Sequence, residues 1–181
     1  MKRKMGALVL AMALLSGCAA PKTPPQSSLK EELTAQDLGR EAYMDLDSGE
    51  AAALHIEEEY SLYIPTEGWT LELESDDGIP NDTWTCDGAE DVRLSIYHYA
   101  DVSFAVARDR YMEDCGYVFS CGLGGGLGDP LSGTDDDGEL CQLMVAEGSH
   151  GTTYVIVWEY PEGSAYEATL TAMANTFALI E

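Results

Sequence analysis

Apolar and polar residues alternate in several short stretches of this chain. A period of two is typical of β-strands that are buried on one face. It predicts a hairpin of strands at 60–64 and 69–74, joined through the turn residues Pro65 and Gly68. Further strands are predicted at 83–86, 92–99, 117–121, 140–147 and 152–160. The run 154–158 is almost continuously apolar, which indicates a central strand covered on both faces.

Apolar residues spaced three and four apart predict two helices. The first covers 103–115 and is followed by Gly116, a common stop residue. The second begins at Ser164, which forms a capping-box pattern with Glu167. Its apolar stripe consists of Tyr166, Leu170, Met173 and Phe177. The Gly- and Asp-rich stretch 122–139 is predicted to be a long loop. These elements predict an α+β fold, an antiparallel β-sheet flanked by two helices.

The start of the chain has the pattern of a secretory signal peptide. Three basic residues, Lys2, Arg3 and Lys4, precede a nine-residue apolar run at 7–15, which is too short to span a bilayer. The run ends in Leu15-Ser16-Gly17-Cys18, which resembles the lipobox of bacterial lipoproteins. That resemblance implies removal of residues 1–17 and acylation of Cys18, palmitate included. It also implies a lipid-anchored protein on the extracytoplasmic side of the cell membrane.

Between the anchor and the strands the chain has weak periodicity. Residues 18–58 begin with a Pro-rich stretch and continue as an acidic segment, so we expect a tether, with a short helix as an alternative for its second half. The globular domain is expected at 59–181. The order of elements, the start Tyr-Ser-Leu-Tyr-Ile-Pro-x-x-Gly-Trp at 60–69 and the closing strand and helix resemble the PsbP-like α/β/α sandwich family. That resemblance implies a binding or scaffolding domain without shared catalytic residues.

The net charge is −24, and loss of 1–17 leaves six basic residues against 33 acidic ones, which gives −27. Nucleic acids and anionic lipid headgroups are repelled by such a charge, so neither is an expected partner. The excess of acidic residues indicates either a solvated surface or a surface that binds cations or a cationic ligand.

Four cysteines follow Cys18. An even number in an exported domain favours two disulfides with three possible pairings, while buried free thiols are the alternative. We hypothesise that Cys121 pairs with Cys141 across the long loop and that Cys86 pairs with Cys115.

Asp135, Asp136, Asp137 and Glu139 cluster in the predicted loop. Their spacing does not match an EF-hand, because the bidentate glutamate is missing, but clustered carboxylates favour weak Ca²⁺ binding. Asp76, Asp77 and Asp82 form a second acidic cluster. No dedicated metal site or cofactor is predicted.

His98 falls on the apolar face of its strand, where it serves as a hydrogen-bonded strand-end residue, or alternatively as a ligand or general base at a pocket. His55 and His150 are expected at the surface or in turns. No nucleophile-elbow or zinc-protease motif is present, so we do not predict an enzyme.

The sequence therefore predicts a non-enzymatic binding or accessory domain whose partner is an envelope protein. An acidic module that captures Ca²⁺ or a cationic ligand is the alternative, and an exported hydrolase is the third interpretation.

Overall fold

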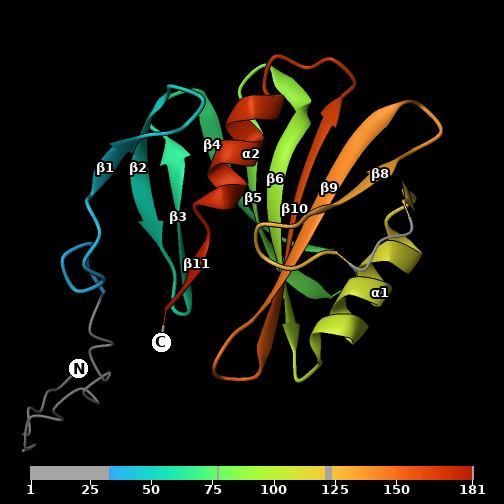
Figure 1. Cartoon of the computed structure of the whole chain (residues 1–181), viewed down its shortest axis with the longest axis horizontal. Helices are drawn as coiled ribbons and strands as arrows, with labels where there is room; N and C mark the ends of the chain where they lie inside the picture. Colours follow the sequence, from blue (N-terminus) through green and yellow to red (C-terminus); the bar gives the residue numbers. More distant parts are fainter. Residues whose placement is uncertain (1–32, 77, 121–123, 181) are drawn as a thin grey trace, which may run out of the picture. The chain divides into compact units, whose positions relative to one another are not determined.

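Residues 33–76, 78–120 and 124–180 are described by the structure, a computed structural model of the chain (Figure 1). The elements follow in the order β1 (Tyr43–Asp45), β2 (Ala51–Ile56), β3 (Tyr60–Pro65), β4 (Trp69–Asp76), β5 (Ile79–Cys86), β6 (Ala89–Ala100), α1 (Phe104–Asp114), β7 (Val118–Phe119), β8 (Leu131–Thr134), β9 (Glu139–Glu147), β10 (Thr152–Pro161), α2 (Glu167–Asn175) and β11 (Ala178–Leu179).

These strands form two sheets within the described part of the chain. One has the order β1-β2-β3-β11, and the other has the order β4-β5-β6-β10-β9-β8-β7. The named strands pair in antiparallel fashion throughout. Two helices beside mostly antiparallel sheet make an α+β fold, as predicted. β10 lies between β6 and β9, which confirms the central position predicted for the apolar run 154–158.

The alternation of side chains along β10 separates two hydrophobic clusters. Val155 and Val157 belong to a cluster that includes Tyr111 of α1. Ile156 and Trp158 belong to a larger cluster that includes Met173 of α2 and side chains from β2 and β3. Successive residues of a strand point to opposite faces, so one continuous apolar run supplies both clusters. In Figure 1, α2 (red) lies beside β3 and β6, whereas α1 (yellow-green) lies beside the lower part of β9.

The folded unit begins earlier than the sequence predicted. It runs from residue 33, so 33–58, expected as the second half of the tether, belongs to the domain. Here β1 pairs with β2, and β2 pairs with β3. Leu46 and Ala52 are buried in the larger cluster, and Arg40 donates to Ser61 Oγ at 2.6 Å. The short helix considered for this segment is wrong, since its regular elements are strands.

The predicted hairpin of 60–64 with 69–74 is wrong, although both strands exist. β3 pairs with β2 and β11, whereas β4 pairs with β5 in the other sheet. The turn at 66–68, where Gly68 has φ +78°, takes the chain from one sheet to the other. The hairpin predicted at 140–147 and 152–160 is confirmed as β9 and β10.

Two local predictions also need correction. The stretch 122–139, predicted as loop throughout, contains β8, which pairs with β7 and β9. The Ser164–Glu167 capping box is not formed, because α2 has Tyr166 as its N-cap and no side-chain cap. Ser164 Oγ instead accepts from the Tyr166 backbone N–H at 3.2 Å. The helix predicted at 103–115 is confirmed as α1.

Candidate binding site

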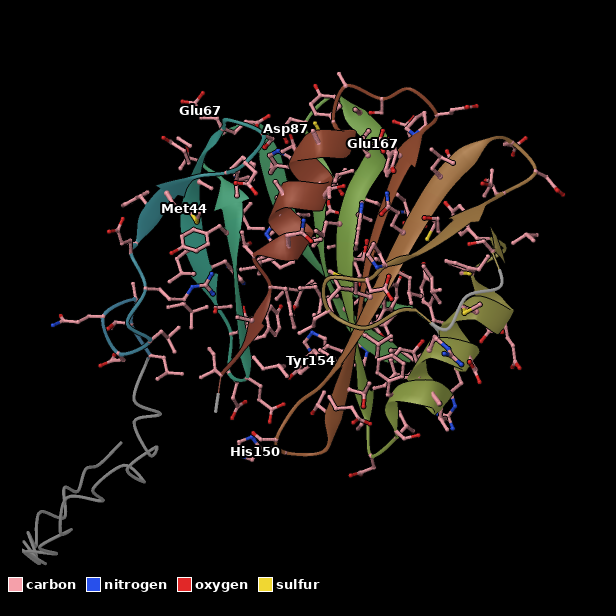
Figure 2. The ribbon with its side chains drawn as sticks, in the orientation of Figure 1. Met44, Glu67, Asp87, His150, Tyr154 and Glu167 are labelled. Atoms are coloured by element: carbon pink, nitrogen blue, oxygen red, sulfur yellow. The ribbon has the colours of Figure 1, made fainter. Side chains whose placement is uncertain are left out.

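A cavity of about 550 Å³ lies where the ends of β3, β6 and β10 meet. Its wall carries three consecutive glutamates, Glu57, Glu58 and Glu59. Two histidines and two tyrosines complete the functional part of the lining: His98, His150, Tyr60 and Tyr154. Figure 2 labels Tyr154 inside the domain and His150 in the turn between β9 and β10. We call this cavity the acidic pocket.

One carboxylate behind the pocket is Asp82 on β5. Its Oδ2 accepts a hydrogen bond from the hydroxyl of Tyr60 and lies 3.0 Å from His98 Nε2. Burial alone would raise the pKa of Asp82, but the hydrogen bonds from His98 and Tyr60 outweigh burial and lower it. An ionised carboxylate only accepts hydrogen bonds, so Nε2 of His98 carries the hydrogen in this contact.

The second carboxylate is Glu59, which is buried at the start of β3. Its Oε2 accepts from the Tyr154 hydroxyl at 2.7 Å, and its Oε1 contacts Nδ1 of His150. Burial raises the pKa of Glu59, but the hydrogen bonds from Tyr154 and His150 outweigh it and lower the pKa. The pocket therefore keeps two ionised carboxylates next to its two tyrosines.

The aromatic rings around these carboxylates form one contiguous group. Tyr60 contacts Tyr154 edge to face with 5.3 Å between ring centroids and stacks on Phe177 at 5.3 Å. His98 contacts Tyr154 at 5.2 Å. Burial, with Asp82 and Glu59 close by, raises the pKa values of the Tyr60 and Tyr154 hydroxyls. Both tyrosines therefore remain neutral hydrogen-bond donors at physiological pH.

Two of the chain's three histidines, His98 and His150, line this pocket, and all three lie beside a carboxylate. His55 Nε2 lies 2.9 Å from Glu57 Oε1, and its ring meets Trp84 edge to face. His98 on β6 and His150 in the turn between β9 and β10 are far apart in the sequence, and the fold brings both to one pocket.

A glycine makes room for the Glu59 carboxylate. A Cβ on Gly148 would lie 2.9 Å from Glu59 Oε2 and 3.1 Å from the ring of Tyr154. Ordinary side chains do not approach so closely. The absence of a side chain at 148 is therefore a steric requirement of the Glu59–Tyr154 hydrogen bond.

The pocket is suited to a positively charged ligand. The described residues that line it include three glutamates but no Lys or Arg. Ionised carboxylates attract ammonium and guanidinium groups through Coulomb interactions. The same lining residues contribute no Ser or Cys nucleophile.

The sequence identified only part of this site. His98 was singled out, and the structure places it at the pocket. Asp82 was assigned to a loose acidic cluster with Asp76 and Asp77, whereas it lies within β5 and binds Tyr60 and His98. Glu59, Tyr60 and Tyr154 were missed as site residues. The available signals were the acidic run 57–59 beside His55 and the tyrosines that start or continue two strands.

The structure bears on one of the two predicted cysteine pairs. Cys86, Cys115 and Cys141 are free thiols in the structure. The structure does not form the Cys86–Cys115 pair: Cys86 belongs to the larger cluster, and Cys115 packs against the cluster of α1. Cys121, the proposed partner of Cys141, and Cys18, the proposed lipid attachment site, lie outside the described residues.

The proposed calcium residues occupy the turn between β8 and β9. The Asp135 carboxylate accepts from the backbone N–H groups of Asp137 and Glu139, at 3.0 and 2.8 Å. Within the described residues, no group of three or more His, Cys, Asp or Glu side chains is placed to hold a metal ion. The structure therefore does not assemble Asp135, Asp136, Asp137 and Glu139 into a calcium site.

Comparisons with known proteins leave the family open. No family model matches the chain, and no curated protein matches it. Among solved structures, the chain is similar to a protein from Bacteroides thetaiotaomicron with a TM-score of 0.41 and 12% identity. The match covers 67% of this chain and 45% of the other, so this chain spans less than half of that protein's length. The described helices include none with the length and apolar character needed to cross a membrane.

Proposed function

We propose that this protein is a non-enzymatic binding domain that captures a cationic group of an envelope protein in the acidic pocket. The single observation that carries the proposal is the composition of the pocket. Three glutamates, two tyrosines and two carboxylate-paired histidines line it, and no Lys or Arg does among the described residues. The ligand group is an ammonium or guanidinium, since a bare metal ion needs several convergent ligands.

The cellular placement in this proposal comes from the lipobox resemblance. Acylation of Cys18 would anchor the domain on the extracytoplasmic side of the cell membrane, and residues between Cys18 and Leu33 would connect it to the lipid. The PsbP-like α/β/α arrangement also belongs to the proposal. The packing of Tyr111 with Val157 on one face, and of Met173 with Trp158 on the other, supports it.

Binding can be measured by titrating the full chain, kept in a neutral detergent, with the amides of Nα-acetyl-lysine and Nα-acetyl-arginine. We expect saturable changes in the NMR signals of His98 and His150. Replacement of one carboxylate by Glu59→Gln should weaken binding at least fivefold, because a charge near the ligand contributes about 1 kcal/mol or more. Equal binding of Nα-acetyl-glutamine amide would contradict a cation site.

Glu67→Gln is the matched control, since Glu67 is exposed in the turn after β3 and does not line the pocket. It removes the same charge and should leave the affinity within twofold. A Ca²⁺ titration tests the alternative function. Saturable binding of Ca²⁺ without any response to the amines would show that the pocket binds a metal ion and not an organic cation. Loss of membrane attachment in Cys18→Ala, together with loss of palmitate labelling, tests the anchor independently.

A further inference from the structure

The outer side of β4 is a free sheet edge. β4 is the first strand of the seven-stranded sheet, and within the described part of the chain it pairs with β5 alone. Residues 70–75 are all exposed, and Leu73 is 75% and Leu71 37% exposed. Large apolar side chains on an unpaired edge are a feature of surfaces to which other strands add.

The backbone pattern shows which groups are available. The N–H of Asp87 donates to the carbonyl of Gly68 at 2.9 Å, so the Trp69–Cys86 pair next to it is a non-hydrogen-bonded pair. In an antiparallel ladder the two kinds of pair alternate. The N–H and C=O groups of Leu71, Leu73 and Ser75 therefore point away from β5, whereas those of Thr70, Glu72 and Glu74 point toward it.

β4 lacks the usual protection of an edge strand. Such strands are commonly short, bulged, or interrupted by proline or lysine. β4 has eight residues, contains neither Pro nor Lys, and pairs with β5 without a register shift. Its one protective feature is charge, because Glu72 and Glu74 alternate with the leucines.

The negative charge of Glu72 and Glu74 determines which kind of strand can bind at this edge. A second copy of this chain would bring two sets of these glutamates together, in molecules that each carry a net charge of −24. A strand with basic side chains would meet opposite charge instead. The face that carries Glu74 also opens onto a cavity of about 480 Å³ lined by Asn81, Thr83 and Ser95, which has room for a long side chain. Arg93 also lines this cavity, and its charge is paired with Glu159.

We propose that the free edge of β4 is a docking site for an extended, basic segment of another protein, which adds to the sheet as a further strand. Alternate side chains of that segment face Glu72 and Glu74, and the others lie over Leu71 and Leu73. The proposal stands apart from the acidic pocket, because residues 71–74 do not line it.

The test uses the full chain in neutral detergent and a seven-residue peptide of alternating Lys and Val. Hydrogen exchange followed by NMR should show new protection at the amides of Leu71, Leu73 and Ser75. The amides of Thr70, Glu72 and Glu74, already bonded to β5, should not change. Protection without this alternation, or no protection at saturating peptide, would overturn the proposal.

Two variants test the role of charge. Glu72→Lys with Glu74→Lys should raise the dissociation constant at least tenfold, whereas Asp136→Lys with Asp137→Lys makes the same change in net charge in an exposed turn and should leave it within twofold. A peptide of alternating Lys and Pro has the same charge but cannot pair as a strand, so equal affinity for it would reduce the interaction to unspecific attraction and refute docking.

Leu73→Ser tests the apolar contact, and Val118→Ser is its control, since Val118 is 76% exposed at the opposite edge of the sheet. The first should weaken peptide binding severalfold and the second should not. Analytical ultracentrifugation distinguishes the other occupant. A dimer that dissociates in Leu73→Ser would assign the edge to a second copy and overturn the basic-segment proposal.

Discussion

His98 Nε2 lies 3.0 Å from Oδ2 of Asp82, the oxygen that also accepts the hydrogen bond of the Tyr60 hydroxyl. One carboxylate oxygen on β5 thus connects β3 and β6, which belong to different sheets. The contact between Asp82 and His98 positions the imidazole at the pocket, and the contact with Tyr60 holds the buried phenol ring beside it. Asp82 is therefore both a structural link and the charge behind the site.

Asp82→Asn should lower the free energy of unfolding by about 1–3 kcal/mol, because it replaces charge-assisted hydrogen bonds by neutral ones in a buried place. Urea denaturation of the full chain measures the change. Asp87→Asn is the control: Asp87 accepts from Thr70 Oγ1 at 2.9 Å but is exposed, and its replacement should cost less than about 0.5 kcal/mol. Equal losses of unfolding free energy in the two variants would show that Asp82 contributes no more to stability than an exposed carboxylate.

The stability of the protein should decrease in acid through Asp82 and Glu59. Their folded-state pKa values lie below the ordinary values of 3.8 and 4.5. A lowered pKa stabilises the fold above the unfolded pKa, and this contribution is lost as the pH falls through the folded pKa. Urea midpoints from pH 6 to pH 3 should therefore fall more steeply in the native chain than in Asp82→Asn with Glu59→Gln. Parallel curves would contradict the lowered pKa values.

Gly148→Ala should disturb the Glu59 carboxylate without introducing charge. The new methyl group would lie 2.9 Å from Glu59 Oε2 and 3.0 Å from the backbone carbonyl oxygen of Thr152, so the carboxylate must shift. We expect a loss of about 1–3 kcal/mol in unfolding free energy, the usual cost of overpacking, and altered His150 NMR signals. In Gly126→Ala the added atom meets nothing within 4 Å. That control should unfold like the native chain, and a similar loss there would point to a backbone effect.

The thiols should be inert in the folded state. Burial raises the pKa of Cys141, and it also raises that of the half-buried Cys115. Thiolates are the reactive species, so iodoacetamide at pH 8 should modify Cys141 slowly in the folded chain and rapidly in urea. Peptide mapping without reductant should show no Cys86–Cys115 link. Finding that link would contradict the placement of these residues in separate clusters.

The predicted elements succeeded where the signal was local. The stripe at 103–115 and the alternation at 140–160 report a period of 3.6 or 2 within one segment, and both became the expected helix or hairpin. The sequence before Tyr60 did not predict β1 and β2, because short, partly exposed strands show little alternation of apolar and polar residues. The capping box at Ser164 failed because side-chain capping depends on a backbone geometry that two residues do not determine.

The residues of the candidate site could likewise be found from the sequence only where the signal was local. His98 could be singled out because a polar residue interrupted an apolar face. Asp82 and Glu59 could not, because their partners are distant: Tyr60 is 22 residues from Asp82, and Tyr154 is 95 residues from Glu59. Acidic residues are so frequent in this chain that no single one stands out.

The sequence by itself determined the strand-rich α+β character, the central apolar strand and the strongly negative charge, since each follows from residue type and local spacing. Only the tertiary structure decided that β3 and β4 belong to different sheets, that the distant His98 and His150 line one pocket, and that β4 is left at an edge. Pairing between strands depends on backbone hydrogen bonds and on side chains far apart in the chain, and local periodicity carries no information about either.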